Sequence, residues 1–191
     1  MKKKLLSTLI IIAVISVSIL IMIIPTFTSE HISRIALNKK LDLELILNDN
    51  KEIKIVFFGY SNCPDICLPR LNSISQYYST LNNNIKDRIG VEFIDISTPS
   101  DKTLPQRYAE FFNPTFKGIY LNKDVLREYT KAFSVFFSPS LFDSTEYEHT
   151  GNLYIVKKAK DSKYLRYIYN AYPYDYKQIN KDIKGLLNET Y

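Results

Sequence analysis

Cysteine and histidine are scarce in this chain, whose 191 residues include only two of each. The cysteines, Cys63 and Cys67, lie four residues apart, and neither has a third thiol to pair with. A scaffold held together by several disulfides is therefore excluded. Three uses remain for the pair: a disulfide between them, a metal site, or packing as small apolar side chains.

The chain also lacks a long block of one charge sign, an internal repeat and a low-complexity segment. Its formal net charge is +5, and part of this comes from Lys2, Lys3 and Lys4. The other lysines and arginines are interleaved with Asp and Glu. This pattern is typical of a solvated surface, so we expect no nucleic-acid partner.

One long hydrophobic run is present, in the twenty uncharged residues from Leu5 to Ile24. About twenty apolar residues span a hydrocarbon core about 30 Å thick. The apolar core of a cleaved signal peptide has only about 7–15 residues, and no A-x-A cleavage pattern follows this run. We expect residues 1–25 to be an uncleaved single-pass anchor in the inner membrane. Because lysines precede the span, the N-terminus should be cytoplasmic and the rest of the chain periplasmic or otherwise extracytoplasmic.

About 160 residues remain, which is enough for one domain with its own core. We expect residues 26–50 to be a tether with a first strand or hairpin in residues 41–50, and residues 51–191 to form the folded domain. Apolar runs and helical apolar spacing indicate the elements of that domain. The expected strands are residues 53–60, 91–97, 116–121, 152–158 and 164–172, and the expected helices are residues 68–81, 104–112, 123–133 and 175–191.

The alternation of strands and helices predicts a parallel sheet, and the last two strands predict an antiparallel edge. The expected fold class is a thioredoxin-like α/β sandwich, with helices flanking a central mixed sheet and one transmembrane helix before it. Ligands of parallel α/β sheets bind at the carboxyl ends of the strands. The segment with both cysteines follows strand 53–60, so it lies at such an end.

The cysteine spacing allows more than one chemistry. Pro64 suits the first turn of a helix, so we expect Cys63 near the N-cap and Cys67 within the first turns. A helix N-terminus favours a thiolate, and residues i and i+4 share one helix face. Two thiolates there suit Cu(I) or Zn(II), and in an oxidising compartment they could form a disulfide instead. The thioredoxin redox motif C-x-x-C is one residue shorter.

His149 is the expected third ligand. It directly precedes the last two strands, in a loop that faces the cysteine loop in a thioredoxin-like sheet. Thioredoxins carry a cis-proline there, whereas this chain has His149-Thr150, with its nearest upstream proline at Pro139. The other histidine, His31, is interpreted as a surface residue. Cys63, Cys67 and His149 thus form a predicted site with two sulfur donors and one nitrogen donor.

Three stretches resemble a known family. "FFGYSNCPDIC" resembles the F-G-[YF]-[ST]-x-C-P-D-[VI]-C signature of the Sco/SenC proteins, membrane-anchored copper chaperones of cytochrome c oxidase assembly. "FFNPTFKGIYL", followed by a helix and "AFSVFFSP", is similar to the family's middle region, and "YEHTGNLYIV" resembles its histidine segment. The resemblance implies that Cys63, Cys67 and His149 bind copper, with the thiolates holding Cu(I) and the imidazole helping with Cu(II).

The resemblance further implies a metallochaperone, not an enzyme with turnover. Such a protein hands copper to the dinuclear CuA site of an oxidase subunit, or first reduces the cysteines of that site. Its partners would be that subunit and a copper donor or thiol reductant. The alternative is a thiol–disulfide oxidoreductase in which Cys63 attacks and Cys67 resolves. A peroxiredoxin-type enzyme is a third possibility, but Tyr60 stands where that family has threonine, and Arg70 is the only nearby arginine.

The chain departs from the family pattern at three places. Leu68 follows the second cysteine where the family usually has proline, and Pro69 comes one residue later. Thr98 and Lys102 stand where aspartates are expected after the second buried strand, and Glu148 replaces the aspartate before the histidine. We expect these changes to affect a docking surface or the handling of Cu(II) more than the binding of Cu(I).

Overall fold

The computed structural model describes residues 11–18, 33–43, 50–61, 63, 65–141, 146–160 and 162–189. The chain divides into two units, Met1–Ile32 and Ser33–Tyr191. Residues 11–18 of the first unit are helical. Within the described ranges, no helix combines the length and the apolar character needed to cross a membrane. Most of the predicted span, residues 5–24, and His31 lie outside the described residues, so the anchor stays a prediction.

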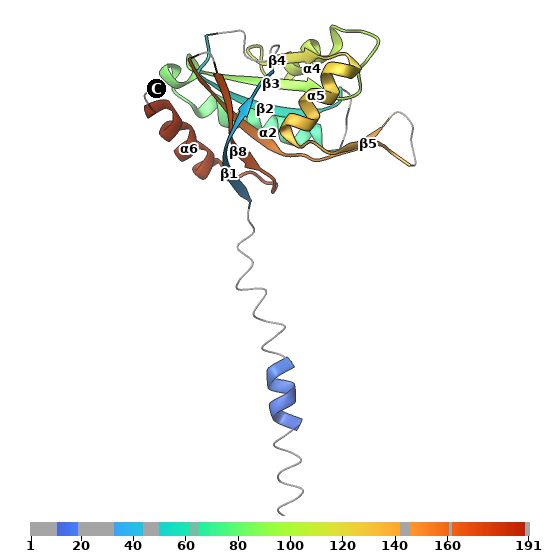
Figure 1. The fold of residues 1–191 in the computed structure, drawn as a ribbon, viewed down its shortest axis with the longest axis vertical. Coiled ribbons are helices and arrows are strands. Elements are labelled where there is room, and N and C mark those ends of the chain that lie inside the picture. The colour runs from blue at the N-terminus through green and yellow to red at the C-terminus, as the bar shows by residue number, and fades with distance from the viewer. Residues whose placement is uncertain are drawn as a thin grey trace, which may run out of the picture. The chain divides into compact units, whose positions relative to one another are not determined.

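The second unit is built on a six-stranded mixed sheet (Figure 1). Strands β2, β3 and β4 are parallel, and β7, β8 and β1 extend the sheet from β2 with antiparallel pairing. The predicted mixed sheet with an antiparallel closing pair is therefore confirmed. The strand order is β1 (Arg34–Leu41), β8 (Ser162–Tyr169), β7 (Leu153–Ala159), β2 (Ile53–Gly59), β3 (Ile89–Asp95) and β4 (Lys117–Tyr120).

Strand β2 forms the centre of the core because both of its faces are covered. Its sequence, IKIVFFG, is buried at every position, as expected of a central strand in a parallel sheet. Phe57 lies beside Phe93 of β3 on one face, while Phe58 belongs to the opposite face. Lys54 is 1% exposed, and its ammonium pairs with Glu92 at 2.9 Å. That contact compensates a charge that would otherwise be buried alone.

Helices cover both faces of the sheet. On the Phe93 face, the ring of Tyr108 in α4 (Leu104–Phe112) lies 5.2 Å from the ring of Phe93. Helix α2 (Cys67–Thr80) packs on this face too, since the space beside Gly59 is filled by Cys67, Phe93 and Phe57. Helix α6 (Tyr176–Asn188) lies beside α2, where the rings of Tyr176 and Tyr77 stack at 4.7 Å. On the other face, Phe133 of α5 (Lys123–Phe133) lies 5.2 Å from Phe58. Helix α5 is in front of the sheet in Figure 1. Asn122 caps α5, because its side chain accepts the N–H of Val125.

Several elements were not predicted from the sequence. They are α3 (Asn83–Lys86) and a two-stranded sheet of β5 (Phe137–Pro139) and β6 (Tyr147–His149). In addition, β1 spans Arg34–Leu41, before the range 41–50 in which the first strand was expected. Only Leu41 of β1 is buried, and β5 and β6 have three residues each, of which two in β5 and one in β6 are exposed. Such strands carry no apolar pattern that sequence could reveal. The strand expected in residues 41–50 falls mostly outside the described residues.

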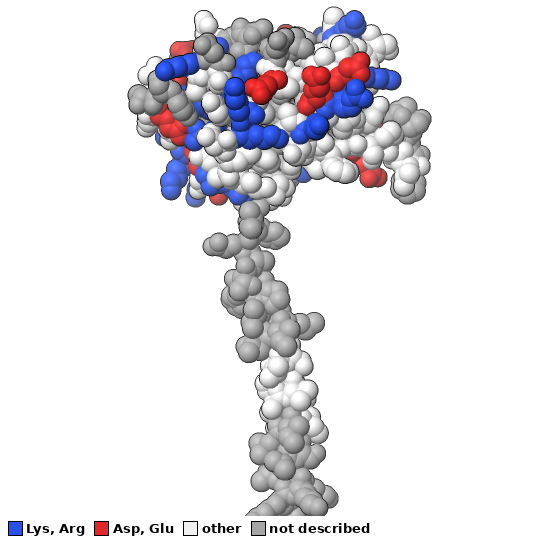
Figure 2. All heavy atoms as spheres, in the orientation of Figure 1, with Lys and Arg blue, Asp and Glu red and all other residues white. Residues whose placement is uncertain are grey.

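The visible surface of the second unit carries both charge signs side by side (Figure 2). Among the ion pairs, Arg107 contacts Asp101 at 2.7 Å and Arg88 contacts Glu52 at 2.5 Å. Exposed pairs of this kind contribute little to stability. The arrangement agrees with the interleaved charges of the sequence.

Candidate metal centre

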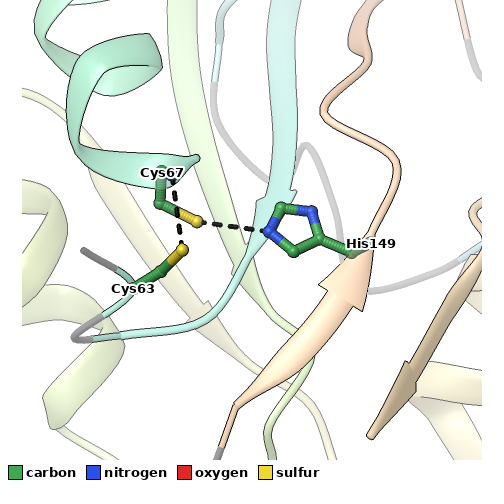
Figure 3. Close-up of side chains that lie close together, drawn as sticks. All are labelled: Cys63, Cys67 and His149. Carbon is green, nitrogen blue, oxygen red and sulfur yellow. Dashed lines mark hydrogen bonds between the residues drawn. The ribbon is translucent and has the colours of Figure 1, made fainter. Parts of the chain in front are cut away.

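The structure brings Cys63, Cys67 and His149 together (Figure 3). Their two sulfurs and one imidazole nitrogen all lie within 4.8 Å of one another. Cys63 lies in the loop after β2, Cys67 is the first residue of α2, and His149 is the last residue of β6. The three residues predicted from sequence therefore form one cluster, at the carboxyl end of the central strand.

The loop that carries Cys63 is fixed by a buried carboxylate. Asp95, the last residue of β3, is 0% exposed and accepts the N–H and hydroxyl of Ser61 at 2.9 and 2.6 Å. Its other oxygen accepts the N–H and hydroxyl of Ser97 at 2.8 and 2.6 Å. Four donors offset the cost of burying this carboxylate. The Cys63 N–H donates to the carbonyl of Tyr60 at 3.2 Å and closes the turn.

Helix α2 begins at Cys67, one residue before the predicted range 68–81, so Cys67 lies in the first turn as predicted. Its N-cap is Ile66, three residues after Cys63, so the prediction that Cys63 lies at the cap is wrong. Instead, the Cys63 side chain turns back, and its sulfur accepts the N–H of Cys67 at 3.5 Å. First-turn amides have no partner inside a helix, and here one of them points at the sulfur. The role expected of Pro64 lies outside the described residues.

Gly59 makes room for the second sulfur. A Cβ at Gly59 would lie 2.4 Å from the sulfur of Cys67, closer than two such atoms can approach. The side chain of Cys67 is fully buried, and that of Cys63 is 4% exposed. The end of β2 and the start of α2 thus enclose both thiols.

The imidazole of His149 is aimed at the thiols. Its Nε2 lies 3.5 Å from the sulfur of Cys67, and its Nδ1 lies 3.2 Å from the carbonyl oxygen of Thr150. If Nδ1 donates to this carbonyl, Nε2 is left with a lone pair for a metal ion. The rings of Tyr60 and Phe57 meet the imidazole edge-on, at centroid distances of 6.0 and 6.4 Å.

The two thiols have opposite pKa shifts. The pKa of Cys63 is lowered to about 3, chiefly by the hydrogen bond from the Cys67 thiol, then by His149 and the N–H groups of Cys67 and Ile66, although burial opposes this. The pKa of Cys67 is raised, because its thiol bonds to the Cys63 sulfur, is buried and lies beside the charge of that thiolate. At neutral pH the pair therefore carries one negative charge, and this charge is on the sulfur of Cys63.

This charge distribution predicts a thiolate titration. The reduced, metal-free chain should show the ultraviolet absorbance of one thiolate at neutral pH. This absorbance should disappear only as the pH falls towards about 3. Cys67→Ala should raise the pKa of Cys63, since the Cys67 thiol is the largest cause of the shift. Cys63→Ser should remove the acid-stable thiolate. A wild-type pair that stayed fully protonated at neutral pH would contradict the geometry.

The departures from the expected acidic pattern lie outside the donor cluster. Glu148 is exposed, and because side chains alternate along a strand it points away from the side of β6 that carries His149. The Lys102 ammonium lies 5.5 Å from the centroid of the Tyr120 ring. Asp101 is also on the surface, where it accepts from Thr103 and Arg107. These positions concern the surface around the site and leave the three donors unchanged.

Comparison with known proteins identifies similar chains. The SCO1/SenC family model matches residues 50–188. An SCO2-like protein of Rickettsia conorii is 28% identical over 132 residues, which cover 65% of this chain and 63% of that protein. The chain therefore spans slightly less than two thirds of the length of that curated relative.

Two solved structures show the same fold. The apo Sco1 protein of Thermus thermophilus superposes with a TM-score of 0.62 at 22% identity, over 83% of this chain and 95% of that one. Arabidopsis thaliana ScoI with copper bound gives a TM-score of 0.59 at 16% identity, over 81% and 99%. The predicted thioredoxin-like α/β class with a central mixed sheet is confirmed.

Proposed function

The chain belongs to the SCO1/SenC family, and from that premise we propose that it is a copper chaperone that delivers copper to the CuA site of cytochrome c oxidase. Copper is its cargo, held by Cys63, Cys67 and His149. The observation that carries the proposal is the convergence of these three donors within 4.8 Å. The likeness to a copper-bound ScoI of the same fold supports the choice of metal.

The spacing of the donors fits a single ion. In zinc sites, which serve here as a guide to donor spacing, a thiolate sulfur lies about 2.3 Å from the metal and an imidazole nitrogen about 2.0–2.1 Å, so two donors of one ion are at most about 4.6 Å apart. The observed limit of 4.8 Å is already close to this value. Two thiolates and an imidazole form a soft donor set that suits copper. Binding therefore requires only a small closing movement.

The three ligands have different tasks. Cys63 is already a thiolate at neutral pH, whereas Cys67 carries a proton that must leave when copper binds. Both thiolates hold Cu(I), and His149 adds the nitrogen donor that Cu(II) requires. Titration of the reduced full-length chain with Cu(I) under anaerobic conditions tests the proposal. We expect one Cu(I) per chain, and a chain that binds no Cu(I) would refute it.

We further propose that residues 1–25 anchor the protein in the inner membrane and that the second unit functions in the periplasm. The run of twenty uncharged residues after a basic start supports this location. After carbonate extraction, the intact chain should remain in the membrane fraction. Release of a shortened, soluble protein would contradict the proposal.

A thiol–disulfide oxidoreductase is the second candidate, and the low pKa of Cys63 favours it. The Cys63 thiolate would attack a substrate disulfide and displace one thiolate. Cys67 would then resolve the mixed disulfide, so that the substrate gains two electrons and the chain is left with a Cys63–Cys67 disulfide. The burial of both sulfurs and the presence of His149 count against this as the main role.

A further inference from the structure

Two side chains on one face of α2 contact the segment that carries His149. Cys67 and Arg70 are three residues apart, so they share a helix face. Cys67 lies 3.5 Å from His149. Arg70 lies directly against Gly151, because a Cβ at Gly151 would be 2.4 Å from the guanidinium carbon. From Cys67 to Arg70 the helix rises by about 4.5 Å. From His149 to Gly151 the backbone spans at most about 7 Å.

The Arg70 guanidinium also contacts Tyr172, and the nearby Tyr174 bonds to Gly151. The guanidinium lies over the ring of Tyr172, 4.9 Å from the centroid, and the Tyr172 hydroxyl donates to the carbonyl of Pro69 at 3.3 Å. The Tyr174 hydroxyl donates to the carbonyl of Gly151 at 2.7 Å. Burial raises the pKa of Tyr174, so this hydroxyl keeps its proton. Arg70 therefore joins α2 to both the His149 segment and Tyr172.

The shape of the arginine side chain matters at this position. A planar guanidinium can stack on Tyr172 with one side and contact the backbone of Gly151 with the other, which a lysine ammonium cannot do. Its Nε is buried and finds no hydrogen-bond partner among the described residues. An unpartnered buried N–H costs free energy. If the side chain only filled space, an apolar residue would therefore be more stable at this position.

We propose that Arg70 is a positioning residue of the metal centre: it braces residues 149–151 against α2 and keeps the His149 imidazole aimed at Cys67. The inference rests on the proposed copper function and deepens it. Because Cu(I) depends on the two thiolates and Cu(II) also on the imidazole, the brace sets the affinity for Cu(II) separately from the affinity for Cu(I).

The first test compares Arg70→Ala with Arg127→Ala in the full-length chain. Arg127 is 80% exposed on α5, far from the cluster in sequence, and serves as the control. We expect Arg70→Ala to lower the affinity for Cu(II) about 10–100-fold, as the loss of outer residues of a metal site does. It should also weaken the thiolate-to-Cu(II) absorption band and leave Cu(I) affinity at the wild-type value. Arg70→Lys should lower the affinity for Cu(II) less than Arg70→Ala does, but it should not reach the wild-type value. Arg127→Ala should leave the affinity for both copper states unchanged. An equal loss of affinity for Cu(I) and Cu(II) in Arg70→Ala, or no loss of affinity for either, would overturn the inference.

The contact with Gly151 can be tested by a double-mutant cycle. None of the described glycines has a positive φ, so the backbone accepts alanine at position 151. The added methyl group must displace the guanidinium. Gly151→Ala should therefore reproduce the Cu(II) defect, and the double variant with Arg70→Ala should be no worse than Arg70→Ala alone. Additive losses would show that the two residues act independently and would refute the brace.

A copper-free measurement separates this inference from the proposed function. The Thr150 N–H donates to the carbonyl of Phe136 at 3.0 Å and protects the amide from exchange. In the metal-free chain, Arg70→Ala should speed hydrogen exchange at Thr150, whereas Arg127→Ala should not. If the wild-type chain bound no copper, the chaperone proposal would fail while this measurement still tested the brace. Unchanged exchange in Arg70→Ala would overturn the brace even if copper bound normally.

Discussion

Cys63→Ser and Cys67→Ser should each abolish tight Cu(I) binding, whereas the wild-type chain should bind one Cu(I). Each substitution replaces a soft sulfur donor by a hydroxyl, which remains protonated at neutral pH and is a poor ligand for Cu(I). One thiolate and His149 are then left, without the sulfur pair on which the site depends. The measurement is anaerobic titration of the reduced full-length chain against a Cu(I) chelator, with metal counted per chain.

The matched control is Leu68→Ala. Leu68 follows Cys67 in the first turn of α2 but is 41% exposed and has no donor atom, so Cu(I) binding should be unchanged. Circular dichroism of each variant should show that folding is retained, because Cys67 is fully buried and its substitution disturbs packing. A double Cys63→Ser/Cys67→Ser variant that bound one Cu(I) with wild-type affinity would exclude the site. Zn(II) that displaced Cu(I) at equal concentration would refute the choice of metal.

The donor set was predictable because its signals are local in the sequence. The apolar run of β2 and the helical spacing after Cys67 place the cysteines between a strand and a helix. Such a position lies at the carboxyl end of a parallel strand, where ligands bind. His149 followed from its place before the last two strands. The structure confirms that the three residues meet.

The supports of the site were not predictable, since they depend on the register of the sheet and on packing. Asp95 reaches Ser61 only because β3 lies beside β2 with Asp95 next to Gly59, although 34 residues separate the two partners. The contact between Arg70 and Gly151 likewise joins segments that are far apart in the sequence. The helix N-cap was placed near Cys63, three residues before its position at Ile66, because a proline indicates a first turn without fixing its residue.

His149→Ala should separate the copper function from the redox function. Imidazole is a good ligand for Cu(II), and Nε2 of His149 lies 3.5 Å from the Cys67 sulfur. The substitution should therefore weaken Cu(II) binding strongly and erase the thiolate-to-Cu(II) absorption band. Formation and reduction of a Cys63–Cys67 disulfide should continue, because those steps need only the two sulfurs. Spectroscopic Cu(II) titration and thiol counting after oxidation measure the two properties on the same sample.

In cells, His149→Ala should lower cytochrome c oxidase activity, as delivery of copper requires. His31→Ala is the matched control, because it removes the only other histidine of the chain and should change neither copper binding nor oxidase activity. The decisive comparison is with Cys63→Ser, which removes both the copper ligand and the attacking thiol. If His149→Ala kept full Cu(II) binding and oxidase assembly while Cys63→Ser lost assembly, the thiols would be acting without the imidazole. The oxidoreductase function would then account for the chain better than copper delivery does.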